Sequence, residues 1–370
     1  MNIILYIGHH KVGSTALQLF LSRNACALLR AGVLYPCVEM EGFSLLLARA
    51  MGKGDGTDWM SVNPREPHSA LAYQMMAEVS PRPIPPQFTL LPRAVQMLHA
   101  IRQQLRYLGP HTMILCSEAF ANFADVDPGL ITRLRRALPE GKVQIYCALR
   151  RPDDYLTAWH GQRIKVGEAI APLRETGISP YIGTIHTDYD KLITPWIDQF
   201  PQARLHLRSY DDICAAGGSP QDFLARTGID LPPGLLPAEA ANPSLPRAAI
   251  EIKRRANLVL PHGETEQLAH HLLTHPSPGA PIPTRQIEMF GAGHRAELAA
   301  LFAPIHAALG QRLGQPAFFA DIDDIARPRP VPEEDAMRAY LAGMDPAAMP
   351  SDALKTFITH LQEETACAPL

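Results

Sequence analysis

The sequence lacks the features that mark several classes of protein. Its six cysteines are scattered and no two have the C-x-x-C spacing, so neither a disulfide framework nor a zinc ribbon is indicated. No apolar run approaches the ~20 residues that a membrane-spanning helix needs. The 34 basic and 37 acidic residues leave a formal charge of −3, so no global field attracts nucleic acid or an anionic membrane. Any site for an anion must therefore be local.

The start of the chain also lacks a basic segment followed by a cleavage site, because an apolar run begins as early as Ile3. The scattered cysteines favour a reducing compartment. We therefore expect a soluble, cytoplasmic protein with no membrane span and no nucleic-acid partner. With 370 residues, the chain can hold one large domain or two ordinary ones.

The most informative stretch is a glycine-bearing loop that follows the apolar run Ile3–Ile7, which predicts a short buried strand. Behind the loop, apolar residues recur at helical spacing: Leu17, Phe20, Leu21, Ala25 and Leu28. In a strand–loop–helix turn the backbone N–H groups point at one spot, and the helix dipole adds partial positive charge there. The stretch therefore suits a phosphate group.

The loop departs from the nucleotide-binding pattern G-x-x-x-x-G-K-[ST] at one position. Gly8, Gly13 and Thr15 occupy its first, sixth and eighth positions, but the seventh holds Ser14 and the only lysine of the loop is Lys11. The loop can still cradle a phosphate, but its cation lies elsewhere than in ATP-binding loops. A glycine turn that binds no ligand is the alternative interpretation.

The rest of the first 230 residues alternates between strands and helices. Spacing predicts strands at 111–116, 143–149 and 204–208 and helices at 93–108, 128–138, 189–200 and 221–226. This order predicts an α/β protein whose parallel sheet is covered by helices on both faces. Residues 37–90 are weakly patterned, with loops at 51–57 and 80–86 and a helix near 70–78. They could form an acceptor-side lid or a surface insertion.

Composition also suggests how the chain is divided. We expect one α/β domain over residues 1–325, with its core sheet in 1–230 and a helical part in 244–320. The proline-rich stretch 231–246 separates these two parts. Residues 326–370 are expected to form a linker, 326–332, and a polar helical tail.

Polar side chains follow three of the predicted strands. Ligands of a parallel sheet bind outside the carboxyl ends of its strands. The first strand delivers Lys11, the strand at 111–116 delivers Glu118, and the strand at 143–149 delivers Arg150 and its neighbour Arg151. A guanidinium offers a fork of donors that matches phosphate oxygens and stays charged. The alternative is that both arginines neutralise the acidic residues that follow, at a helix start.

Here the residues resemble a known family. Lys-x-Gly-[Ser/Thr]-Thr after an N-terminal strand, present as Lys11–Thr15, resembles the 5′-phosphosulfate loop of sulfotransferases that use 3′-phosphoadenosine-5′-phosphosulfate. The longer form, Ile7–Gln18 followed by Ala31–Pro36, is similar to a bacterial branch of that family. The matching pieces, at 3–36, 112–120, 143–166 and 187–228, come in the family's order. The resemblance implies a P-loop-like, nucleotide-kinase-like sulfotransferase fold with helical C-terminal additions.

The resemblance also implies roles for the donor-binding residues. The donor's 5′-phosphosulfate would lie against the loop residues Lys11, Gly13, Ser14, Thr15 and Ala16. Arg150 matches the family's 3′-phosphate arginine, and Tyr210 of Tyr-Asp-Asp matches the tyrosine near the adenine.

The chain departs from the family at the serine that follows the arginine by eight residues, because this position is Ala158. The neighbouring Thr157 lies ~100° around a 3.6-residue helix, so it is not an automatic substitute. The missing hydroxyl weakens the case for tight 3′-phosphate binding.

Sulfuryl transfer needs an acceptor in line, charge to meet the leaving phosphate and a group that takes the acceptor's proton. Lys11 and the loop's amides and hydroxyls serve the leaving group, and they take the place of magnesium, so no metal is required. Glu118 is the candidate base because the family uses either His or Glu; its alternative role is to cap a helix or pair with an arginine. His10 is the rival base, and a hydrogen-bonded loop histidine is its alternative role.

We therefore expect a sulfotransferase acting on an acceptor hydroxyl, with a carbohydrate or another small molecule as the candidate acceptor. A kinase or NTPase predicts lysine at position 14 and aspartate after the strand at 143–149, where this chain has Ser14 and Arg150. A degenerate nucleotide-binding protein of the same fold is the other alternative, suggested by Ala158. His271 and His275 lie four residues apart without a third ligand in view, so we interpret them as surface histidines.

Overall fold

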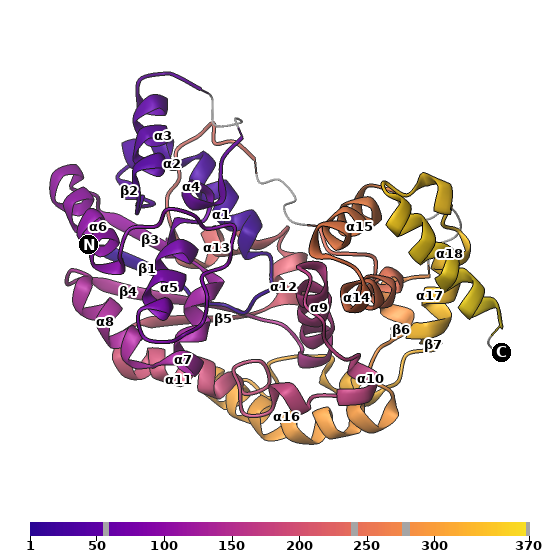
Figure 1. The fold of residues 1–370 in the computed structure, drawn as a ribbon. Coiled ribbons are helices and arrows are strands. Elements are labelled where there is room, and N and C mark those ends of the chain that lie inside the picture. The colour runs from indigo at the N-terminus through magenta and orange to yellow at the C-terminus, as the bar shows by residue number, and fades with distance from the viewer. Residues whose placement is uncertain (55–58, 238–242, 276–281, 368–370) are drawn as a thin grey trace. The chain divides into compact units, whose positions relative to one another are not determined.

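The structure is a computed structural model that describes residues 1–54, 59–237, 243–275 and 282–367 (Figure 1). Its contacts divide the chain into two compact units, neither of which is continuous in sequence. Unit 1 contains Met1–Arg150, Gly183–Ala241 and Ile305–Phe318, and unit 2 contains Arg151–Ile182, Asn242–Pro304 and Phe319–Leu370. The division inferred from composition, at residue 325, follows different boundaries.

Unit 1 is built on a five-stranded sheet in which every pair of neighbours is parallel. Its strands are β1 (Asn2–Tyr6), β2 (Val33–Leu34), β3 (Thr112–Cys116), β4 (Lys142–Leu149) and β5 (Arg204–Ser209). The order β2-β3-β1-β4-β5 places β1 at the centre, with Tyr6 in register with Cys116 on one side and Tyr146 on the other. The predicted parallel α/β class is confirmed.

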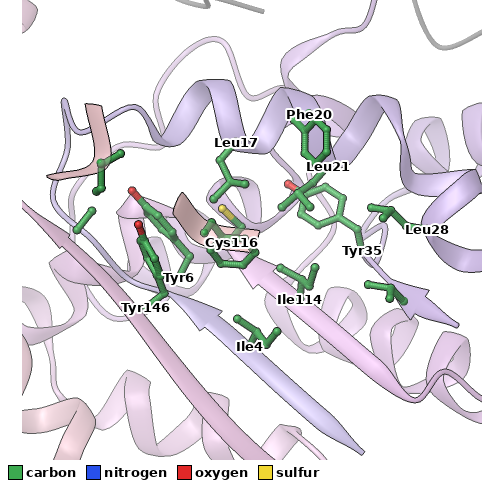
Figure 2. Packing of buried hydrophobic residues seen from close by; sticks show 14 of the residues in the cluster. Ile4, Tyr6, Leu17, Phe20, Leu21, Leu28, Tyr35, Ile114, Cys116 and Tyr146 are labelled. Atoms are coloured by element: carbon green, nitrogen blue, oxygen red, sulfur yellow. The ribbon is translucent and has the colours of Figure 1, made fainter. Parts of the chain in front are cut away.

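Both faces of this sheet are buried under helices. On one face Ile4, Tyr6 and Tyr146 pack against side chains of α1 (Ser14–Arg23) and α13 (Ser219–Thr227), and Figure 2 shows the centre of this cluster. The alternate residues Ile3 and Leu5 are equally buried on the opposite face, where α8 (Gly129–Ala137) and α11 (Tyr189–Gln199) lie in Figure 1. Burial on both faces explains why most of β1 and β3 and the second half of β4 are continuous apolar runs.

The weakly patterned stretch 37–90 contains more structure than its sequence suggests. It holds α3 (Met40–Ala50), α4 (Val62–Arg65) and α5 (Pro67–Ala77). Leu71 and Met75 of α5 are fully buried, and α5 contacts β3, so this helix belongs to the core and is not a surface insertion. Residues 55–57 of the first expected loop, and 238–242 of the proline-rich boundary, lie outside the described residues.

The other described helices of unit 1 are α2 (Ala25–Arg30), α6 (Ala94–Leu108), η1 (Glu118–Asn122), α7 (Phe123–Val126), α12 (Tyr210–Ala215) and the part of α16 (Ala292–Leu313) from Ile305 on. The helices predicted at 93–108, 128–138, 189–200 and 221–226 are present as α6, α8, α11 and α13, with ends that differ by at most two residues. Nowhere in the described ranges is a helix both long enough and apolar enough to cross a membrane.

Unit 2 is mainly helical. It holds α9 (Pro152–Lys165), α10 (Leu173–Thr176), α14 (Ile250–Val259), α15 (His262–Thr274), α17 (Glu333–Ala342), α18 (Asp352–Cys367) and the part of α16 (Ala292–Leu313) up to Pro304. The expected linker, 326–332, ends in β7 (Val331–Pro332), which pairs with β6 (Ile287–Glu288). The expected tail is helical, as α17 and α18, and these helices bury Met337 and Leu354.

Candidate functional site

The loop after β1 runs beside β4 and is hydrogen-bonded to it. The N–H groups of Ile7 and His9 donate to the carbonyls of Tyr146 and Ala148, each at 2.9 Å. A Cβ at Gly8 would lie 2.7 Å from the backbone nitrogen of Ala148. This position therefore requires glycine because the two backbones approach each other too closely for a side chain.

The loop then turns into α1 through left-handed backbone. Gly13, the N-cap of α1, has φ 83°, and Lys11 has φ 58°, which is uncommon for a residue with a side chain. The hydroxyl of Ser219 donates to the carbonyl of Val12 at 2.9 Å and holds the turn from outside. The first turn of α1 carries no acidic residue, so its dipole remains available to an anion.

One amide of the expected cradle is already engaged. The N–H of Ala16 donates to the carbonyl of Gly13 at 3.2 Å, within the first turn of α1. A phosphate at this helix end would therefore depend mainly on the amides that precede Ala16 in the chain.

Glu118 lies beside this loop. It begins η1 directly after β3, and its carboxylate accepts hydrogen bonds from the hydroxyl of Ser14 and from Nε2 of Gln18, the latter at 2.8 Å. The Nδ1 atom of His10 is 4.0 Å from its Oε1 atom. Residues that follow two different strands thus meet at one point of unit 1.

The surroundings of Glu118 make it a stronger base than an exposed glutamate. Burial raises the pKa of its carboxyl, and the hydrogen bonds from Ser14 and Gln18 and the charge of Lys11 oppose that rise without cancelling it. The side chain is still 16% exposed, so a ligand can reach it. A raised pKa brings a general base closer to the pH at which it must work.

His10 is less suited to accept a proton. Burial lowers its pKa to about 4, and the charge of Lys11 acts in the same direction, so the ring is neutral at pH 7. The Nε2 atom accepts a hydrogen bond from Nδ2 of Asn122 at 3.2 Å, which leaves the ring proton on Nδ1, the nitrogen nearer Glu118. The contact with Glu118 is therefore not an ion pair, and the geometry favours Glu118 over His10 as the base.

Arg150 and Tyr210 meet on the other side of the loop. The guanidinium of Arg150, at the end of β4, lies 4.9 Å from the ring centroid of Tyr210, the first residue of α12. Its Nη1 atom is 3.4 Å from the backbone oxygen of Lys11. The hydroxyl of Tyr189 donates to the backbone oxygen of Arg150 at 2.6 Å and fixes the chain at this point. The guanidinium is thus held between the loop and an aromatic ring.

Arg151 has a different environment within unit 2. Its Nε atom donates to Asp153 at 2.7 Å, and its guanidinium also pairs with Asp154 and Asp321. Arg295, at 3.1 Å, and Arg329, at 3.3 Å, also pair with the buried Asp153. The interpretation that arginine neutralises these acidic residues is therefore correct for Arg151, whereas Arg150 is the arginine held at the loop.

The serine missing from the sequence motif has no replacement in Thr157. The Thr157 hydroxyl donates to the backbone oxygen of Asp153 at 2.6 Å, one turn back in α9. That hydroxyl is engaged within its own helix, so weakened 3′-phosphate binding through Ala158 stays a prediction.

Sequence reasoning missed residues that surround Glu118 from α1 and α5. Gln18 could have been noticed because it lies one turn from Ser14 on the same face of α1. Ser69 gives no sequence signal, yet its Oγ atom is 2.8 Å from that of Ser117 and 3.5 Å from Nε2 of Gln18. Glu66 lies just before α5, paired with Arg65 at 2.8 Å, and burial followed by the charge of Glu118 raises its pKa to about 7.

No metal centre is evident in the parts of the chain that the structure describes, because no three His, Cys, Asp or Glu side chains are grouped there as metal ligands. The rings of His271 and His275 stack with their centroids 4.5 Å apart.

Comparison with known proteins assigns no family. No protein-family description and no solved structure matches the chain. A curated protein from Archaeoglobus fulgidus, named only as an uncharacterized protein, is 31% identical over 146 residues, which are 39% of this chain and 38% of that protein. The chain thus spans little more than a third of this relative's length, and the relative's name states no activity.

Proposed function

We propose that the protein is a sulfotransferase that moves a sulfuryl group from 3′-phosphoadenosine-5′-phosphosulfate to an acceptor hydroxyl. The observation that supports this most is the arrangement around the loop after β1. The loop carries its own lysine, Arg150 is held on one side of it, and the partly buried Glu118 contacts Ser14 on the other. These are a place for phosphate, a second anion-binding group and a base.

The strand order supports a ligand site at this position. After β1 the chain crosses to β2 on one side of the sheet, and after β4 it continues to β5 on the other. Ligands of open parallel sheets bind at such a switch point, outside the carboxyl ends of the strands. The loop and Arg150 lie at the carboxyl ends of β1 and β4. This arrangement agrees with the proposed P-loop-like sulfotransferase fold.

The donor fits the residues that are present. Lys11 and the amides that begin α1 would hold the 5′-phosphate, Arg150 would bind the 3′-phosphate, and Tyr210 would lie near the adenine. Lys11 and Gly13 have left-handed backbone, a conformation that in other anion-binding loops turns successive N–H groups toward the ligand. The donor supplies an activated sulfuryl group and a stable leaving group. Lys11 supplies the positive charge that magnesium supplies in ATP-using enzymes, so the reaction is expected to need no metal.

In the proposed reaction the acceptor oxygen forms a bond to sulfur while the bond between sulfur and the 5′-phosphate oxygen breaks. The electron pair of the broken bond stays on the phosphate, where Lys11 and the helix end meet its charge. The acceptor's proton passes to Glu118, which later releases it to water. The products are a sulfated acceptor and adenosine 3′,5′-bisphosphate.

Two alternatives predict different behaviour. A kinase or NTPase would need a cation at position 14, where Ser14 instead donates a hydrogen bond to Glu118. A degenerate nucleotide-binding protein would hold the donor without consuming it, and Ala158 is the residue that suggests it.

The deciding experiment incubates the purified protein with ³⁵S-labelled donor and a panel of hydroxyl-bearing glycans and metabolites in the presence of EDTA. We expect a labelled product together with adenosine 3′,5′-bisphosphate, detected by mass spectrometry. Phosphoryl transfer from ATP that depends on magnesium, without sulfuryl transfer, would establish the kinase alternative. Donor binding without consumption across the panel would establish the degenerate binding protein.

A further inference from the structure

Gln18 is a fully buried glutamine that, within the described ranges, has hydrogen-bond partners at only one end of its amide. The Nε2 atom donates to Oε2 of Glu118 at 2.8 Å and lies 3.5 Å from Oγ of Ser69. The Oε1 atom is also buried, and among the described residues it has no hydrogen-bond partner. A buried amide oxygen without a partner costs free energy. An apolar side chain of similar length would avoid that cost, so stability alone does not explain a glutamine here.

Gln104 shows what a structural glutamine looks like in the same unit. It is also buried, but its Oε1 atom accepts from the N–H of Cys37 at 3.0 Å and its Nε2 atom donates to the carbonyl of Cys37 at 2.8 Å. Both ends of its amide are paired with backbone. The contrast indicates that the amide of Gln18 is retained for its contact with Glu118.

Gln18 also connects Glu118 to the helix that begins at the loop. Ser14 and Gln18 are one turn apart on α1, and both donate to the same carboxylate. The end of α1 that would bind the phosphate therefore belongs to the same rigid element that holds Glu118.

We propose that Gln18 is a positioning residue for Glu118, donating one N–H to hold the ionised carboxylate in place beside the loop. This inference rests on the proposed function for its role in transfer, but the contact itself can be tested without any substrate. A donor to the ionised form lowers the carboxyl pKa, so its removal must raise that pKa.

Other titratable groups that face Glu118 can affect the measurement of its pKa. They come from the loop, β1, β3, the residue after β2, the N-cap of α5 and its middle: Lys11, His10, Tyr6, Cys116, Tyr35, Glu66 and Tyr73. Burial raises the pKa of the tyrosines and of Cys116, and lowers that of His10 to about 4. The charge of Glu118 is one cause of the raised pKa of Glu66, which is about 7, so the titration of either carboxyl affects that of the other. Measurements are therefore made in both the native and the Glu66→Gln background.

The test uses Gln18→Met, which keeps the length of the side chain and removes the donor. Protein labelled with ¹³C at glutamate carboxyls is titrated by NMR, and the Glu118 resonance is identified as the one missing from Glu118→Gln. We expect the Glu118 pKa to rise by about one to two units, the equivalent of one lost hydrogen bond to a charged group. The melting temperature should stay the same or rise. Gln104→Met is the matched control, expected to lower the melting temperature and leave the Glu118 pKa unchanged.

An unchanged Glu118 pKa in Gln18→Met, or a loss of stability as large as that in Gln104→Met, would overturn the inference. The pH–rate profile separates it from the proposed function, because the acidic limb of transfer should move to higher pH together with the NMR pKa. A shifted pKa in a protein that transfers no sulfuryl group would reject the proposed function and leave the positioning contact standing. A shifted pKa with an unmoved acidic limb would show that Gln18 does not act on the transfer step.

Discussion

Replacing Arg150 by lysine tests the donor site most directly. The guanidinium stacks 4.9 Å from the ring centroid of Tyr210, and its Nη1 atom is 3.4 Å from the backbone oxygen of Lys11. Lysine would keep the positive charge but lose the planar fork and the stacked face. Arg150→Lys therefore changes geometry while it leaves the net charge of the site unchanged.

The size of the effect follows from the interactions that are lost. A hydrogen bond to a charged group contributes about 1.5–3 kcal/mol, which corresponds to a loss in affinity of about 10- to 150-fold. The loss should be confined to ligands that carry the 3′-phosphate. AMP has the same base, sugar and 5′-phosphate, so it serves as the ligand that lacks only this contact.

Isothermal titration calorimetry with both nucleotides, without magnesium, measures this difference. We expect Arg150→Lys to weaken binding of adenosine 3′,5′-bisphosphate by that factor and to change AMP binding by less than about threefold. Arg204→Lys, at an exposed arginine that begins β5, is the matched control and should change neither affinity. An equal loss for both nucleotides, or equal binding of both by the native protein, would refute the assignment of Arg150 to the 3′-phosphate.

Three further substitutions test the rest of the chain. Lys11→Ala should slow turnover more than it weakens bisphosphate binding, because the charge of Lys11 stabilises a leaving group that forms only as the bond breaks. Normal turnover in this variant would show that the loop only binds the nucleotide. Glu118→Gln should keep donor binding while transfer falls ~10²–10⁴-fold and the acidic limb of the pH profile disappears. If transfer stayed near normal, the base would lie elsewhere, and His10→Asn would be the next variant to assay. The pKa of Glu333 is raised to about 7, chiefly by burial and then by the charge of Glu251, so its contribution to stability is full below pH 4.5 and is lost as the pH rises through 7. Urea unfolding should therefore show that the free energy of unfolding of Glu333→Gln, relative to that of the native protein, increases by about 3 kcal/mol from pH 4 to pH 9. A difference that stays constant over this pH range would contradict this prediction.

Local patterns were sufficient for the sheet and for most of its helices. Residues 113–116 and 145–149 are continuous apolar runs because they are buried on both faces, and this pattern can be read without the fold. The helix α5 illustrates the limit. Its apolar residues lie all around the helix because it is buried on nearly every side, so no amphipathic period marks its bounds. The pairing of β7 with β6 is also absent from any local pattern, because the partners are 44 residues apart, Ile287 with Val331.

The sequence predicts which residues of the candidate site follow the ends of the strands. It does not predict which side chains of the site contact one another. The rule for strand ends brings Lys11, Glu118 and Arg150 to one edge of the sheet. It cannot separate Arg150 from Arg151, which are adjacent and chemically identical. Only the structure shows that Arg151 pairs with the nearby Asp153 and with Asp321, which is 170 positions away. The contact between Gln18 and Ser69 links residues 51 positions apart, and no periodicity connects them.

We infer that the basicity of Glu118 depends on the departure of the loop from the ATP-binding pattern. Ser14 occupies the position of the ATPase lysine, and in this structure its hydroxyl donates to Glu118. An ammonium at the same point would form an ion pair with that carboxylate and lower its pKa by about 1–3 units. A glutamate held that way would be a poorer acceptor for a hydroxyl proton. With serine at position 14 and the lysine at position 11, the loop would keep a cation for the proposed phosphate, and the carboxyl next to it retains a pKa above its ordinary value.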